Sequence, residues 1–181
     1  MRHTDHMTLF YGSADFLSNR HQSPFQFRGL RFNCVEQFMM FSKAKMFADE
    51  GTAAKIMATD DPRQHKALGR AVKGYDDAQW AAKRSNIVAV ACREKFAQNP
   101  ALLAALLDTK ETTIVEASPY DRIWGIGLGE SDPRALDPAK WQGLNLLGIA
   151  LMTVRTHLRQ AAACSAQPEA RMPARVRAHP R

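Results

Sequence analysis

The chain has 181 residues and a formal net charge of +7. This length fits one domain with a sizeable core. Residues 161–181 hold four arginines and one glutamate, which is +3 of the total, so residues 1–160 carry only about +4. A mildly basic body suits a phosphorylated small substrate, whereas non-specific duplex binding usually needs a stripe of Lys and Arg on one face.

Cysteine usage and hydropathy exclude several classes of protein. The three cysteines are far apart and form no Cys-x-x-Cys pair. They indicate a reducing compartment rather than a disulfide framework or a zinc site. No secretory signal follows Met1, and no apolar run approaches the roughly 20 residues that span a bilayer. The sequence therefore predicts a cytoplasmic protein with no membrane partner, no bound metal and no cofactor.

The first elements in chain order are a hairpin and a helix. Residues 25–27 and 30–32 alternate apolar and polar around the turn Arg28-Gly29, which predicts a β-hairpin. Asn33 and Glu36 have the spacing of a capping box, which predicts a helix from Asn33 to about Phe47.

Further helices are predicted over residues 61–72, 76–98, 99–107 and 145–159, from caps, N-terminal prolines and apolar periodicity. β-Branched residues predict one strand over 112–116. We therefore expect a mainly α protein, a single compact domain of five to six helices with a small β element, over residues 1–160. Residues 161–181 lack an apolar period, and we expect a basic, disordered tail.

Residues 118–155 are rich in side chains that bind ligands. Asp121, Trp124, Gly125 and Asn145 precede the last helix within a loop containing several glycines. Asp121 either binds a ribose hydroxyl or water, or caps its own loop. Trp124 and Gly125 offer a stacking surface beside a backbone that a planar ligand can approach. We expect this segment to form the rim of a pocket.

Glu36 and Lys43 lie two turns apart on one face of the first predicted helix. A carboxylate can stabilise an oxocarbenium-like sugar, and an amine near C1 can attack it or form a Schiff base. The lysine would need a lowered pKa, for which burial near Lys45 or Arg84 is a candidate cause. The structural alternatives are a capping glutamate and a solvated lysine.

Several side chains are candidates for binding phosphate. Asn145 stands where the last helix begins, and helix N-termini bind anions. Arg20, Arg84 and Arg155 are the candidate cations. The spacing Gly-x-Gly-x-Gly at 125–129 does not indicate a dinucleotide fold, because no strand precedes it. Trp80, in mid-helix, is expected in the core. Trp141 fits either a place in the core or a stacking contact with a ligand.

Five blocks of sequence together resemble the NADAR/YbiA-like family of N-glycosidases. They are Phe16-Leu-Ser-Asn19, residues 32–45, Trp80-x-x-x-Arg84, Lys95-Phe96-x-Gln-Asn99 with Ile114-Val115-Glu116, and residues 118–155. Their order and spacing agree from about Thr8 to Leu158. The resemblance implies hydrolysis of an N-glycosidic bond between a phosphorylated ribose and a base-like group.

The resemblance also implies roles for individual residues. It places the catalytic groups at Glu36, Lys43 and Asp121, and the substrate-binding groups at Phe16, Ser18, Asn19, Arg84, Trp124, Gly125 and Asn145. The leading hypothesis is a metal-independent hydrolase that releases ribose 5-phosphate from phosphoribosylamino-pyrimidine intermediates of riboflavin biosynthesis. The alternatives are removal of ADP-ribose from guanine in nucleic acid, and a non-catalytic module that binds ADP-ribose or nucleic acid.

Overall fold

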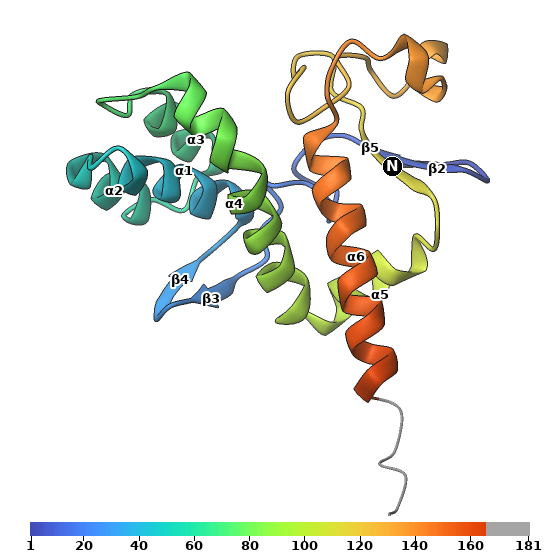
Figure 1. Ribbon diagram of the computed structural model, residues 1–181, viewed down its shortest axis with the longest axis horizontal. Helices are drawn as coiled ribbons and strands as arrows, with labels where there is room; N and C mark the ends of the chain where they lie inside the picture. The colour runs from blue at the N-terminus through green and yellow to red at the C-terminus, as the bar shows by residue number, and fades with distance from the viewer. Residues whose placement is uncertain (166–181) are drawn as a thin grey trace, which may run out of the picture.

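The computed structural model describes residues 1–165, which form six α-helices and two small sheets (Figure 1). The helices are α1 (Val35–Met46), α2 (Glu50–Met57), α3 (Pro62–Arg70), α4 (Asp77–Ala97), α5 (Pro100–Asp108) and α6 (Leu146–Ser165). Two short 3-10 helices, Pro133–Leu136 and Pro138–Lys140, lie in the loop before α6. This confirms a compact domain of helices with a few short strands.

Two of the sequence-predicted caps form with their side chains. Asp61 accepts a hydrogen bond from the Arg63 amide at the start of α3, and Asp76 accepts one from the Gln79 amide at the start of α4. The Asp61 cap is followed by proline at the first helical position, which needs no hydrogen-bond partner for its nitrogen. These local signals explain why the helices begin where the sequence predicted.

The two sheets differ in how their strands are connected along the chain. β3 (Phe25–Phe27) and β4 (Leu30–Phe32) form the predicted hairpin, with Arg28 and Gly29 both at positive φ in its two-residue turn. The other sheet has the order β1 (Arg2–His3), β2 (Met7–Phe10), β5 (Thr113–Glu116), and β2 pairs with β5 in parallel. All helices from α1 to α5 lie in the connection between these two parallel strands.

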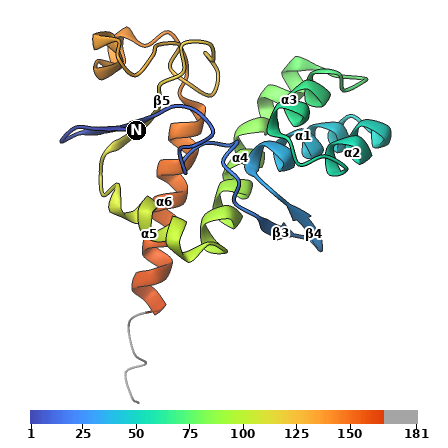
Figure 2. The same ribbon diagram turned by 180° about the vertical axis from the view of Figure 1, so that it is seen from behind.

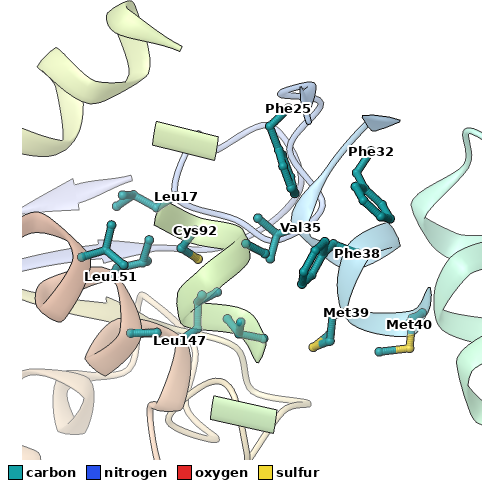
Figure 3. Close-up of a cluster of buried hydrophobic side chains, with 14 of the residues drawn as sticks. Leu17, Phe25, Phe32, Val35, Phe38, Met39, Met40, Cys92, Leu147 and Leu151 are labelled. Atoms are coloured by element: carbon teal, nitrogen blue, oxygen red, sulfur yellow. The ribbon is translucent and has the colours of Figure 1, made fainter. Parts of the chain in front are cut away.

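The helices form two groups joined by α4. Helices α1, α2 and α3 and the hairpin lie on one side of α4, whereas α6, α5 and the β2–β5 pair lie on the other (Figures 1 and 2). Helix α4 packs against both α1 and α6. The main core follows this arrangement, with Phe25, Phe32 and Phe38 near one end and Leu147 and Leu151 of α6 near the other (Figure 3).

Four elements depart from the expectations. Helix α2, which has eight residues and is capped by Asp49, was not predicted, and neither were β1 and β2. Strand β2 is buried at every residue, so it shows no alternation of apolar and polar positions. Helix α6 continues to Ser165, five positions past the expected domain boundary at 160. The rest of the expected tail, 166–181, lies outside the described residues.

None of the helices in the described part of the chain combines the length and apolar character needed to cross a bilayer.

Candidate active site

A cavity of about 440 Å³ opens where five segments of the chain meet. They are the loop 11–20, helix α1, helix α3, the end of β5 and the loop 118–124. Both parallel strands end at this cavity, because Tyr11 follows β2 and Glu116 closes β5. The carboxyl ends of parallel strands are a frequent position for ligand sites.

Helix α1 brings Glu36 and Lys43 to the cavity, as their spacing predicted. Glu36 is only 5% exposed, and burial raises its pKa from 4.5 to about 7. The negative charge of Asp121 also raises this pKa, whereas Lys66 and Arg20 lower it. Glu36 is therefore protonated in about half of the molecules near neutral pH.

The capping-box prediction for Glu36 is wrong. The N-cap of α1 is Cys34, and no side chain caps it. The Asn33 amide nitrogen of the backbone donates instead to Oε1 of Gln37, and the Asn33 side chain donates to Asp60. Because Gln37 takes the role expected of Glu36, the capping argument no longer explains a glutamate at position 36.

Lys43 is half-buried and held in place by two contacts. Its Nζ donates to the carbonyl oxygen of Gly69 at 2.8 Å and lies 3.9 Å from the ring centre of Tyr75. Burial lowers its pKa, and Asp77 opposes that shift. The neighbouring cations do not cause the shift, because Lys45 points outward and pairs with Glu50. Lys43 thus has the lowered pKa that an attacking amine needs.

Asp121 and Trp124 shape the opposite loop. Oδ1 of Asp121 accepts hydrogen bonds from the backbone amides of Ile123 and Trp124, at 2.9 and 2.8 Å. Asp121 therefore caps its own loop and lines the cavity at the same time. Tyr120 beside it is 89% exposed at the cavity rim.

The loop 11–20 is fixed from beneath by a buried lysine. Lys95 of α4 is 1% exposed, and its Nζ donates to the carbonyl oxygens of Phe16 at 2.6 Å and Ser18 at 3.0 Å. Burial lowers the pKa of Lys95 to about 8. The carbonyl of Asn19 in turn accepts from the Glu36 amide at 2.8 Å, so the loop and α1 are joined at the cavity.

Three cations line the cavity without forming an ion pair within residues 1–165. They are Arg20 of the loop and Lys66 and Arg70 of α3. Lys66 and Arg70 are four positions apart and so share one face of the helix. No hydrogen bond or ion pair to any of these three side chains exists among residues 1–165.

The structure brings six of the ten sequence-predicted site residues to the cavity. These are Ser18, Asn19, Glu36, Lys43, Asp121 and Trp124. Phe16, Arg84, Gly125 and Asn145 do not line it. Phe16 packs edge-on against Phe96 of the core. A Cβ at Gly125 would lie 2.8 Å from the Glu116 carbonyl oxygen, so the loop itself fills the space that a ligand was expected to occupy.

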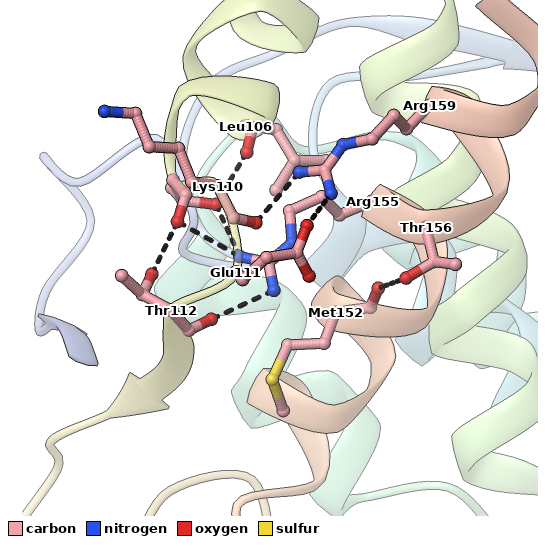
Figure 4. Close-up of polar contacts among 9 residues, drawn as sticks. Leu106, Lys110, Glu111, Thr112, Met152, Arg155, Thr156 and Arg159 are labelled. Atoms are coloured by element: carbon pink, nitrogen blue, oxygen red, sulfur yellow. Dashed lines mark hydrogen bonds and ion pairs between the residues drawn. The ribbon is translucent and has the colours of Figure 1, made fainter. Parts of the chain in front are cut away.

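Asn145 and Arg155 have structural contacts instead of the phosphate contacts considered from the sequence. The buried Asn145 side chain accepts from the Glu116 amide and donates to the Ile114 carbonyl oxygen, which ties the start of α6 to β5. Arg155 is also buried and donates to Oγ1 of Thr109 and to the Thr112 carbonyl oxygen (Figure 4).

Trp80 and Trp141 both have structural contacts. Trp80 lies in the core, as predicted, whereas Trp141 packs on a second small core and donates from Nε1 to the Ala135 carbonyl oxygen at 2.9 Å.

Several cavity residues were not predicted as site residues, namely Tyr11, Lys66, Arg70, Glu116, Ser118 and Tyr120, of which the last three stood only within blocks of the family resemblance. A signal existed for Lys66 and Arg70, because their spacing places both on one face of a helix that the sequence predicted. Among residues 1–165, no group of three or more His, Cys, Asp or Glu side chains is arranged to hold a metal ion.

Comparison with known proteins places this chain in a family. The NADAR domain matches residues 2–159, so the chain belongs to the NADAR family. The structure is similar to the NMR structure of the Escherichia coli protein YbiA, with a TM-score of 0.73 and 25% identity, over 94% of each chain.

Three curated relatives show the range of names in the family. Protein irg-1 of Caenorhabditis elegans is 36% identical over 166 residues, which are 83% of this chain and 78% of that protein. An N-glycosidase of Acanthamoeba polyphaga mimivirus is 43% identical over 126 residues, which are 70% of this chain and 74% of that protein. A riboflavin biosynthesis protein of Vibrio vulnificus is 30% identical over 122 residues, which are 67% of this chain but 30% of that longer protein.

Proposed function

We propose that this protein is an N-glycosidase that cleaves the bond between C1 of a phosphorylated ribose and a base-like group. The observation that carries the proposal is the placement of buried Glu36 and half-buried Lys43 on one helix face, in a cavity that three unpaired cations also line. The N-glycosidase name of the mimivirus relative supports the same reaction class.

The two α1 side chains have complementary tasks at the sugar. As the C1–N bond weakens, positive charge develops on the ribose, and the Glu36 carboxylate stabilises it. The Lys43 amine, with its lowered pKa, is the group that attacks C1 or forms a Schiff base with the opened sugar. Water then completes the hydrolysis and releases ribose phosphate.

The unpaired cations Arg20, Lys66 and Arg70 bind the phosphate. These three side chains supply positive charge, and the raised pKa values of Glu36 and Glu116 reduce the negative charge that opposes it near pH 7. The cavity therefore favours an anionic group such as a phosphate monoester. We propose this cluster in place of Arg84, which does not line the cavity.

For the substrate, we propose the phosphoribosylamino-pyrimidine intermediates of riboflavin biosynthesis. The support is the name of the Vibrio vulnificus relative, together with a cavity whose charge suits one phosphate group.

A second candidate is removal of ADP-ribose from guanine in nucleic acid. It is supported by Tyr120, which is 89% exposed at the rim, and by Tyr11, which is 43% exposed there. Exposed aromatic rings beside a cationic cavity are suitable for stacking with a base outside it. A non-catalytic module is disfavoured, because binding alone gives no reason to bury Glu36 beside other carboxyl groups at a cost in stability.

The test is direct assay of both substrates with matched variants. Purified protein is incubated with phosphoribosylamino-pyrimidine and, separately, with ADP-ribosylated guanosine, and released base is measured by chromatography. Glu36→Gln and Lys43→Ala should each lower turnover by roughly 100-fold or more. Lys45→Ala is the control, since it removes an exposed lysine of the same helix. Borohydride trapping followed by mass spectrometry reports whether Lys43 bonds to C1.

Absence of base release from both substrates would contradict the enzyme proposal. Turnover within a few-fold of wild type in both α1 variants would contradict the roles given to Glu36 and Lys43.

A further inference from the structure

Glu116 is a second carboxyl group in the cavity, half-buried at the end of β5, that the roles above leave unused. It is the last residue of β5, paired in register with Phe10 at the end of β2. Its side chain lines the cavity with Glu36 and Asp121.

The backbone of Glu116 is fixed by three hydrogen bonds. Its amide donates to Oδ1 of Asn145 at 3.1 Å. Its carbonyl oxygen accepts from the amides of Ile126 at 3.0 Å and Ser118 at 2.9 Å. A side chain on such a clamped backbone has a defined direction, which is what a group that transfers a proton requires.

The side chain itself has no comparable partner. Oε2 of Glu116 is buried, yet it makes no hydrogen bond within the described residues. A buried polar oxygen without a partner is costly, and such groups are typically kept for a ligand or for chemistry. The fold therefore holds the backbone of Glu116 rigidly and leaves its carboxyl group to the contents of the cavity.

The surroundings of Glu116 also favour its protonated form. Burial is the largest cause, and the charges of Asp121 and Glu36 add to it, whereas Arg20 and Lys66 oppose it. Together they raise the pKa of Glu116 to about 7. A carboxyl group with this pKa can both give and take a proton near neutral pH.

We propose that Glu116 is the general acid that protonates the departing nitrogen of the base. This inference rests on the proposed N-glycosidase function. As the C1–N bond breaks, its electron pair passes to the nitrogen, which takes the proton of Glu116 and leaves as a neutral amine. The positive charge remains on the ribose, and Glu36 faces it. Water then supplies the hydroxyl group of the released sugar and loses its second proton to solvent, and Glu116 takes up a proton from solvent before the next turnover.

This proton is needed whether water or the Lys43 amine attacks C1, because a base nitrogen leaves poorly as an anion. The proposal therefore does not depend on whether the reaction passes through a covalent intermediate.

The test compares two leaving groups. Wild type, Glu116→Gln and Glu36→Gln are assayed on phosphoribosylamino-pyrimidine and on 4-nitrophenyl riboside 5-phosphate, whose nitrophenolate leaves without a proton. We expect Glu116→Gln to lose roughly 100-fold in kcat on the amine and to remain within about threefold on the nitrophenyl substrate. Glu36→Gln should lose activity on both, since it acts on the sugar that the two substrates share.

A pH profile gives an independent readout. The kcat/KM of wild type on the amine should fall as pH rises through about 7, because deprotonated Glu116 has no proton to give. Glu116→Asp keeps a carboxylic acid one methylene shorter, and it serves if Glu116→Gln fails to fold. It should retain the alkaline decline with a lower rate.

The outcomes separate the inference from the function on which it rests. Equal losses of Glu116→Gln on both leaving groups, or full activity on the amine, would overturn the general-acid role while leaving the N-glycosidase function intact. If wild type releases base neither from the amine substrate nor from ADP-ribosylated guanosine, the proposed function fails and the role of Glu116 fails with it.

Discussion

Replacing Glu36 by glutamine should stabilise the protein at alkaline pH while it removes activity. Burial raises the pKa of Glu36 from 4.5 to about 7. Because the pKa is higher in the folded state, the folded protein binds more protons than the unfolded chain between these values. The favourable contribution is fully present below about pH 4.5 and is lost as pH rises through about 7.

The size of the effect follows from the two pKa values. Between pH 5 and pH 8 the contribution of Glu36 to the free energy of unfolding falls by about 2.5 kcal/mol, at 1.36 kcal/mol per pKa unit. Glutamine has nearly the same shape and does not ionise. The stability of Glu36→Gln relative to wild type should therefore increase by about this amount over the same interval.

Urea unfolding at pH 5, 6, 7 and 8 measures this difference directly. The control is Glu50→Gln, which removes a carboxylate that is exposed at the start of α2. Glu116 titrates in both wild type and Glu36→Gln, so most of its contribution cancels. A stability difference that does not change with pH would refute the reasoning. A variant that is less stable at every pH would show that Glu36 has a structural role.

Three further outcomes are expected. Lys95→Met leaves the buried carbonyls of Phe16 and Ser18 without a donor, so urea unfolding should show a loss of about 2–3 kcal/mol, with a raised KM. Gly148→Ala places a Cβ 2.1 Å from a strand carbonyl oxygen and should cost about 3 kcal/mol, whereas Gly129→Ala, with open space around it, should cost far less. Activity should survive prolonged chelation by EDTA, and its restoration by one specific divalent ion would contradict metal independence.

Much of the fold was predictable from the sequence because its signals are local. The Asp61 and Asp76 caps, the prolines at the first helical positions and the Arg28-Gly29 turn act within a few residues, and all form as expected. Helix α2 was missed because it is short and its first turn contains Gly51 and Thr52, which have weak helix propensity. Strand β2 was missed because both of its faces are covered, which removes the period-2 pattern.

In the candidate site, too, the sequence predicts what local periodicity determines and does not predict what depends on strand pairing. Glu36 and Lys43 could be placed together from the sequence, because helical periodicity fixes which side chains share a face. Glu116 could not, because nothing local shows that residues 7–10 and 113–116 pair in parallel. That pairing brings the end of β5 beside the loop that follows β2, and so adds a second carboxyl group to the cavity.

Asn145 shows why position in the sequence misleads at this site. Its place before a helix and its amide group suggested a phosphate ligand, yet its side chain connects the amide of Glu116 with the carbonyl of Ile114. The same residue that lies outside the cavity therefore fixes the backbone of a carboxyl group inside it. Residues around 145 belong to one of the blocks that resemble the NADAR family. The support that Asn145 gives to the backbone of Glu116 explains why an asparagine stands at this position, and no contact between Asn145 and the substrate is needed.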